Sequence, residues 1–390
     1  MPVGRSGKKK SQAPFFSQQF FIENHADIVS CVCMVICVGM MFQVSQPFSS
    51  MFVAAQYNIT TNITEGEDKP PETLYLLGAR DGFTVFFYTL IWITLHAVLH
   101  EYIWEKWCRR LHLSKTKTTE FYDSGQLAVY YLLSTIIGAT VLQRRECFSS
   151  LSLLWRDYPD IPISFIEKMY YINQIAYWMH WFPELYLMKA KRHEIKDKVV
   201  FYTLSLAFIL THYSFSYIRL GIFFLTVHHL VECLNYTVQV LELAGKQQSA
   251  QPLHSAWSVV FVVARIATMT VAAAAFLFGL PKVDGNNLEV GFETGNFNIP
   301  VVRFPLFAAI IGISLYHTWD FVMFQINIRQ DALEQKESME KERQRQREKK
   351  KNRRDQDARR RKKEEEEETK ASNESSTVGQ SSPRKREGRK

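Results

Sequence analysis

The feature that most constrains this chain is the sharp division of its hydropathy. Residues up to about 325 are apolar in blocks, and the last 65 or so are almost wholly polar, so the mean hydropathy of −0.14 describes neither part. About 20 consecutive apolar residues span the hydrocarbon core of a bilayer. Several such windows precede residue 325, which predicts a polytopic membrane protein and excludes a soluble enzyme.

Eight windows are candidate transmembrane helices, and together they predict an all-α fold. The third, fourth and fifth are diluted by polar and aromatic residues, which a helix packed inside a bundle tolerates better than one facing lipid. The candidates are 28–48, 82–103, 126–143, 166–188, 199–215, 219–241, 257–280 and 302–325.

The distribution of Lys and Arg predicts the orientation. An even number of spans places both termini on one side, and the loops on that side, with the N-terminus, carry 15 basic residues against 7 on the other. Basic loops stay in the cytosol, so both termini are expected to be cytosolic. Residues 1–27 are polar, with no cleavage site after the first apolar block, so this block is expected to remain as an anchor.

Two sequons agree with this orientation. Asn58 and Asn62 each begin an Asn-x-Thr sequence in the first non-cytosolic loop, and we expect glycosylation there. The sequons at Asn235, inside a span, and Asn373, in the tail, are interpreted as accidental.

The tail carries most of the net charge. From Gln325 onward there are 22 Lys and Arg against 15 Asp and Glu. Opposite charges recur four residues apart, as in Glu337 and Lys341, which predicts a solvated helix over 327–368 and disorder from Thr369. The basic runs 349–351 and 359–363 suit ribosomal RNA or anionic lipid, whereas the Glu run 364–368 argues against simple lipid adhesion. A solvated spacer and a real contact both remain open.

Motifs for catalysis and metal binding are scarce. His96 and His100 lie one helical turn apart, but a di-iron site would need about eight histidines, and Leu225 stands where a second histidine box needs His. There is no P-loop, Gly-x-Ser-x-Gly or His-Glu-x-x-His sequence. Only Cys147 of the six cysteines falls in a luminal loop. Neither a metal, a cofactor nor a luminal disulfide is expected.

Ionisable residues inside the spans form a second candidate feature. Because such residues are costly in a bilayer, they usually face the bundle interior and pair with one another. Arg265 in the seventh span requires a carboxylate, for which Glu232 or Glu184 is expected. The cluster acts either as a structural latch between helices or as a hydrated cavity used for function; it comprises His180, Glu184, His228, His229, Glu232 and Arg265.

Several sequence stretches resemble the translocating chain-associated membrane protein family. They are Asn24 to Ser30, His112 to Lys117, Ser124 to Leu127, Gln174 to Tyr186 and Gly295 to Asn298. The likeness covers about 15–325, whereas the tail is this chain's own. It implies eight spans, cytosolic ends and a glycan in the first luminal loop. It also implies an accessory protein of the endoplasmic reticulum, which contacts signal sequences and nascent transmembrane segments beside the Sec translocon.

The stretch 117–326 also resembles the TLC domain, a six-helix membrane domain shared with ceramide synthases. Those enzymes carry a paired His where this chain has Phe201 and Tyr202, and a His-Asp-x-x-Asp pattern where it has His228-His229-x-x-Glu232. Since acyl transfer needs a base, the resemblance implies a helical bundle that has kept the shared fold but has lost acyl-transfer activity. A membrane-embedded lipid enzyme or lipid-binding protein remains the alternative function.

The expected organisation therefore has four parts. Residues 1–27 form a cytosolic terminus, 28–116 two spans with the glycosylatable loop, 117–326 the six-helix domain and 327–390 the charged tail. The expected partners are the Sec translocon, nascent secretory and membrane polypeptides, membrane lipids and, through the basic tail, the ribosome. No catalytic residue is assigned.

Overall fold

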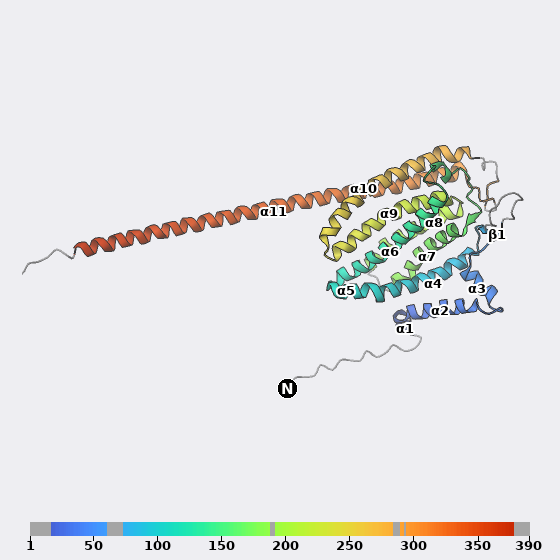
Figure 1. Ribbon diagram of the computed structural model, residues 1–390, viewed down its shortest axis with the longest axis horizontal. Helices are drawn as coiled ribbons and strands as arrows, with labels where there is room; N and C mark the ends of the chain where they lie inside the picture. Colours follow the sequence, from blue (N-terminus) through green and yellow to red (C-terminus); the bar gives the residue numbers. More distant parts are fainter. Residues whose placement is uncertain (1–16, 61–72, 188–191, 284–288, 292–293, 378–390) are drawn as a thin grey trace, which may run out of the picture. The chain divides into compact units, whose positions relative to one another are not determined.

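The computed structural model describes residues 17–60, 73–187, 192–283, 289–291 and 294–377, and helices dominate it (Figure 1). The chain divides into two compact units, Met1–Ser314 and Leu315–Lys390. The elements, in chain order, are α1 Gln18–Glu23, α2 His25–Gly39, α3 Gln46–Val53, β1 Asn58–Thr60, β2 Thr73–Tyr75, α4 Asp81–Leu99, η1 His100–Trp104, α5 Glu105–Leu111, α6 Lys115–Arg144, η2 Leu151–Leu154, β3 Ile163–Ser164, α7 Phe165–Leu187, α8 Arg192–Ser214, α9 Ile218–Leu243, α10 Gln247–Ala273, η3 Ala274–Gly279, η4 Leu280–Lys282 and α11 Pro300–Thr377.

The helices confirm the all-α membrane fold. Within the part of the chain that the structure describes, five helical stretches are long and apolar enough to cross a bilayer, namely Asp81–Leu111, Lys115–Arg144, Ile218–Leu243, Gln247–Lys282 and Pro300–Glu367. Helices α7 and α8 have 23 residues each, which is about 35 Å of helix, but their polar and aromatic residues lower their hydropathy. The count of eight spans stays a prediction.

The first expected span, 28–48, differs in the structure. Helix α2 ends at Gly39, and at 15 residues it is about 22 Å long, which is shorter than a bilayer core. After a turn the chain continues as α3, and Ser45 Oγ donates a hydrogen bond to the Gly39 carbonyl at 2.8 Å. A Cβ on Gly39 would lie 2.2 Å from Ser49 Oγ. The missing side chain therefore lets α3 fold back against the end of α2.

The core of the first unit is unusually aromatic. Helix α6 packs along α9, α9 against α10, α4 against α7, and α7 against α8. The largest fully buried side chains include Tyr131, Tyr171 and Tyr217. Gly138 permits the close approach of α6 to α9, because a Cβ there would lie 2.1 Å from Thr226 Oγ1. Packing of this kind explains why the middle spans look weak by hydropathy alone.

A small sheet, which the sequence did not indicate, marks one end of the bundle. Strand β2 pairs antiparallel with β1, where Asn58 faces Tyr75, and with β3, where Leu74 faces Ser164. We call this the sheet end, and Figure 1 shows β1 there beside the start of α4. At the opposite end, the starts of α6 and α8 and the ends of α7 and α9 surround one cavity. We call it the basic end, because the loops there are rich in Lys and Arg.

The second unit is helical throughout its described part. Every residue from Ile326 to Glu367 is exposed, and ion pairs join Glu337 to Lys341 at 3.9 Å and Arg360 to Glu364 at 3.3 Å. The disorder expected from Thr369 is not seen up to Thr377, where α11 ends. The segment 369–377 contains neither Pro nor Gly, and the first Gly of the tail is Gly379. The composition of 369–377 is therefore compatible with the helix seen there.

Candidate functional site

The six ionisable residues expected inside the membrane lie on three helices of the first unit. His180 and Glu184 are on α7, His228, His229 and Glu232 on α9, and Arg265 on α10. His180, Glu184, His229 and Arg265 are buried, whereas His228 and Glu232 are partly buried. Their contacts divide them into three groups.

The α7 group extends toward the N-terminal helices. His180 Nε2 lies 3.4 Å from Nδ1 of His96 on α4, and His180 Nδ1 contacts the carbonyl of Tyr177. Glu184 Oε1 lies 3.9 Å from His25 Nε2 at the start of α2. The two residues thus join α7 to α4 and to α2, which are elements outside the six-helix domain.

The second group surrounds His229 between α6, α7 and α9. His229 Nδ1 lies 2.7 Å from Ser134 Oγ, which also accepts a hydrogen bond from the Gln174 amide. Tyr130 donates to the Gln174 carbonyl oxygen. Because His229 is only 1 % exposed and its neighbours are themselves hydrogen-bonded, this group is a closed polar network.

The third group holds Arg265 together with His228 and Glu232. Arg265 Nη2 lies 3.4 Å from His228 Nδ1, and the guanidinium lies 5.2 Å from the centre of the Phe261 ring. Glu232 accepts a hydrogen bond from Asn235 of its own helix at 3.3 Å. Glu184 lies against His25, as described above. The arginine therefore contacts an imidazole and an aromatic face, and Glu232 acts on it through a charge interaction without a hydrogen bond.

Aromatic rings connect these groups. The rings of Tyr130 and Tyr177 are stacked, with their centroids 3.3 Å apart. Tyr130 also packs against His229, and Tyr177 packs against His180. Tyr131 lies against His228 and His229. The interior of the bundle is thus a continuous layer of aromatic and polar side chains.

A cavity with a volume of about 660 Å³ opens at the basic end. That volume lies in the range of small-molecule sites. Lys198 and Asp123 form an ion pair of 3.1 Å in its wall. The lining residues are Lys117, Glu120, Asp123, Ser124, Leu127, Trp181, Asp197, Lys198, Phe201, Tyr202, Tyr236, Gln239, Glu242 and Leu243.

Phe201 and Tyr202, which the sequence resemblance aligns with the ceramide synthase histidine pair, line this cavity. Phe201 is 39 % exposed and packs against Trp178, whereas Tyr202 is 6 % exposed and stacks on Trp181 with ring centroids 5.5 Å apart. Neither a phenyl ring nor a buried phenol is a useful general base. His229 is not among the residues that line the cavity. Among the described residues, the lining of the cavity includes no histidine.

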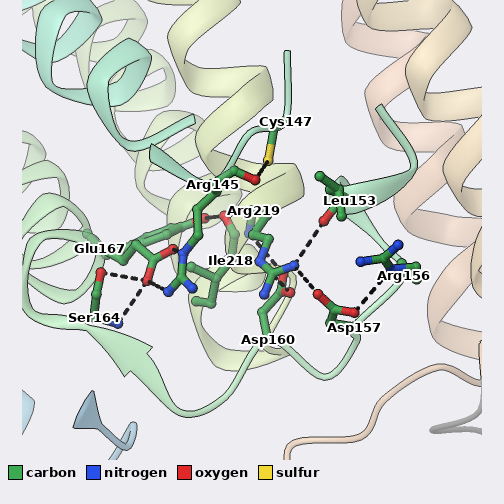
Figure 2. Close-up of polar contacts among 11 residues, drawn as sticks. Arg145, Cys147, Leu153, Arg156, Asp157, Asp160, Ser164, Glu167, Ile218 and Arg219 are labelled. Atoms are coloured by element: carbon green, nitrogen blue, oxygen red, sulfur yellow. Dashed lines mark hydrogen bonds and ion pairs between the residues drawn. The ribbon is translucent and has the colours of Figure 1, made fainter. Parts of the chain in front are cut away.

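Sequence reasoning missed an ion-pair network at the sheet end (Figure 2). Arg145 at the end of α6 binds Glu167 through two hydrogen bonds, and Glu167 also accepts from the backbone N–H and hydroxyl of Ser164. At the start of α9, Arg219 contacts Asp157 at 2.8 Å and Asp160 at 3.3 Å. The available signal was an arginine at each of two span ends, with acidic residues in the loop and helix start that follow the first of them.

The two aspartates of this network have opposite pKa shifts. Hydrogen bonding to Arg219 lowers the pKa of Asp157. Burial raises the pKa of Asp160 to about 7, although Arg219 acts in the opposite direction. The network lines a cavity of only about 140 Å³, and its charges are already paired. Its evident role is to fix the connection between α6 and α7 onto α9.

The remaining expectations concern the glycosylation sites, His100, metal binding and the cysteines. Asn58 is exposed in β1, and Asn62 lies outside the described residues. His100 packs on Tyr122 with ring centroids 4.3 Å apart. Within the described ranges, no three His, Cys, Asp or Glu side chains come together to hold a metal ion. All six cysteines are free.

Fold and site together define a polytopic membrane protein with a helical bundle of the TLC type. Residues 120–323 match the TLC domain family. The chain belongs to the translocating chain-associated membrane protein family, whose TLC domain it carries, as the sequence resemblance implied.

Individual relatives support this assignment. The chain is 34 % identical over 319 residues to translocating chain-associated membrane protein 2 of Homo sapiens, covering 82 % of this chain and 84 % of that protein. It is 33 % identical over the same length to that of Mus musculus. A more distant relative is sphingosine N-acyltransferase lag1 of Schizosaccharomyces pombe, which is 22 % identical over 221 residues and covers 56 % of this chain and 52 % of that protein.

Proposed function

We propose that this protein is an accessory component of the endoplasmic reticulum translocation machinery. In this proposal both termini are cytosolic, and the basic end of the bundle faces the cytosol. The protein contacts signal sequences and nascent transmembrane segments beside the Sec translocon and aids their translocation or insertion. It acts as a binding protein and not as an enzyme.

The observation that carries this proposal is that the chain resembles a translocating chain-associated membrane protein but has no histidine pair at Phe201 and Tyr202. The likeness to translocating chain-associated membrane protein 2 covers more than four fifths of both chains. At the same time Phe201 and Tyr202 occupy the cavity positions where acyl transfer would require the histidine pair. A bundle that keeps the cavity without the base suits binding better than catalysis.

The buried ionisable residues suggest a physical mechanism. Moving a charged side chain to the centre of a bilayer costs a few kcal/mol by insertion scales. His180, Glu184, His228, Glu232 and Arg265 place polar groups inside the bundle. Such groups would thin or hydrate the neighbouring bilayer and so lower this cost for the charged flank of a signal sequence. The partners are the Sec translocon, nascent polypeptides, membrane lipids and, through the charged tail, the ribosome.

Photocrosslinking in microsomes tests the proposal. A ribosome-bound nascent chain carries a photoreactive residue in its signal sequence, and we expect a crosslink to this protein beside the one to the channel. The control is the same nascent chain with its signal sequence replaced by a polar segment, which should give no crosslink. Absence of the crosslink across several precursors, at normal protein levels, contradicts the proposal.

A lipid enzyme or lipid-binding protein is the second candidate. It is favoured by the likeness to a sphingosine N-acyltransferase and by the adjacent histidines His228 and His229. Burial of His229 against Ser134 weighs against it. This candidate predicts transfer of an acyl group to a sphingoid base by the purified protein, lost in His229→Ala. A purified protein that carries one class of lipid but transfers no acyl group would favour the lipid-binding form.

A further inference from the structure

The charged part of α11 has a pattern that the proposed function does not explain. Between Arg343 and Lys363 there are 13 Lys and Arg against three acidic residues. This segment of 21 residues is about 31 Å long as a helix. The segments on either side are acidic, with five acidic against three basic residues over 329–342, and five Glu over 364–368. We call residues 343–363 the basic block.

The basic block is charged on all sides. At 100° per residue, its Lys and Arg surround the helix axis and leave no empty sector wider than about 60°. Each of its residues is exposed, and it contains no large aliphatic or aromatic side chain. The only large apolar residues of the tail after Ile328 and before the block are Leu333 and Met339. The block therefore has no apolar stripe with which a helix lies in a membrane interface.

This geometry distinguishes between two polyanions. A flat anionic bilayer touches one face of a helix, so about half of these charges would point away from it, and the neighbouring Glu run would be repelled. Phosphates line both sides of the major groove of A-form RNA, which is too narrow for a helix in a regular duplex but can enclose one where an internal loop or bulge widens it. A-form RNA is recognised mainly by its shape and its backbone rather than by its base edges. An evenly charged rod in which Lys and Arg outnumber all other residues suits such recognition.

We propose that residues 343–363 bind double-helical RNA as a continuous helix, lying in the major groove where an internal loop or bulge widens it, with phosphate contacts and without sequence preference. The proposal rests on the proposed function only for the source of the duplex, because a translating ribosome would supply it. The acidic run that follows the block limits the contact to about six helical turns. The single continuous helix, and not the charge alone, is what favours a duplex over a single strand.

Binding of a fluorescent 20-base-pair RNA duplex with a central internal loop to the full-length protein in nanodiscs of neutral lipid tests this. We expect saturable binding that weakens steeply with salt, because each phosphate contact releases counterions. Neutralising Arg360, Arg361, Lys362 and Lys363 to Gln should weaken binding at least tenfold and flatten the salt dependence. The matched control changes Glu364, Glu365, Glu366 and Glu367 to Gln, and binding should then stay equal or strengthen.

A second variant separates groove binding from simple attraction. Asn352→Pro keeps every charge but interrupts the helix in the middle of the block. It should weaken binding of the duplex severalfold and leave binding of a single strand of equal length nearly unchanged. Equal duplex binding by Asn352→Pro, or preference for the single strand in the unaltered protein, overturns the groove proposal.

The membrane is the remaining outcome. If the protein in neutral nanodiscs associates with vesicles containing phosphatidylserine more strongly than with the duplex, and the four-residue Gln variant abolishes this, the block is a lipid patch and the RNA proposal is wrong. The RNA measurement contains neither nascent chain nor channel, so its failure leaves the photocrosslinking test of the proposed function untouched.

Discussion

Lys168 Nζ lies 2.7 Å from Asp81 Oδ1, and neither side chain is open to solvent. Lys168 also donates to the carbonyls of Gln56 and Leu76, at 2.8 and 2.6 Å. Asp81 accepts a hydrogen bond from the hydroxyl of Tyr213 at 2.8 Å. This single pair thus joins α4, α7 and α8 to the chain between α3 and α4 at the sheet end.

Removing either partner of this pair should destabilise the bundle. Lys168→Met leaves the carboxylate buried without its cation, and Asp81→Asn leaves the ammonium without its anion. Each should lower the free energy of unfolding by about 3–5 kcal/mol. Denaturant titration in mixed micelles measures this. The double variant should cost clearly less than the sum, and additive costs would show that the two charges are not coupled.

The intramembrane groups are predicted to matter for client insertion. Replacing Arg265 and Glu232 together by Leu removes two polar groups from the space between α9 and α10 while keeping apolar volume. Insertion of a dependent precursor into reconstituted vesicles should fall to the level without this protein. Arg265→Lys is the conservative control and should retain most of the effect. Unchanged insertion by the double Leu variant, at normal expression, would argue for a purely structural latch.

Stability at the sheet end should depend on pH through Asp160. Because burial raises the pKa of Asp160 from 3.8 to about 7, the folded chain keeps this proton after the unfolded chain has lost it. Its contribution to stability therefore declines as pH rises from about 4 to about 7. Asp157, whose pKa is lowered, contributes the opposite slope only below about pH 4.

Asp160→Asn provides the measurement for this slope. Thermal unfolding in detergent should show the melting temperature of the unaltered protein decreasing relative to that of Asp160→Asn between pH 4.5 and 7.5. A constant difference across that range would mean that Arg219 holds Asp160 ionised throughout.

The exposed Asn58 of β1 gives a test of orientation. If the sheet end is luminal, expression in microsomes should attach a glycan to Asn58, and Asn58→Gln should remove one endoglycosidase-sensitive mobility shift. Asn373→Gln, in the tail, should change nothing. A glycan on Asn373 would reverse the proposed orientation.

Much of the fold was predictable because it depends on local hydropathy and charge. The apolar windows located the long helices α4, α6, α9 and α10, and most of the expected starts and ends lie within about a turn and a half of the observed ones. The exceptions include the starts of α6 and α10, which lie about three turns before the windows. The span 28–48 was misjudged, since an apolar composition does not reveal a reversal at Gly39 that depends on a contact with Ser49. The helix after Thr369 was missed for a different reason, because a highly charged segment without Pro or Gly is compatible with both disorder and an isolated helix.

The candidate site was predictable only as a set of residues. Spacing indicated that His180, Glu184, His229 and Arg265 face the interior, and all four are buried. It did not indicate that Arg265 lies against His228, or that His25 approaches Glu184, because these contacts join helices whose relative rotation the sequence does not specify.

The sequence by itself determined that the chain is a membrane-embedded helical bundle with a charged, helical tail, because the bilayer demands long apolar helices and a highly charged segment cannot bury a core. Only the tertiary structure decided which polar groups meet. The ion pairs of Lys168 with Asp81 and of Arg219 with Asp157 and Asp160 connect residues 59 to 87 positions apart. The packing of the helices determines which side chains pair, and this packing is a property of the whole bundle rather than of any single segment.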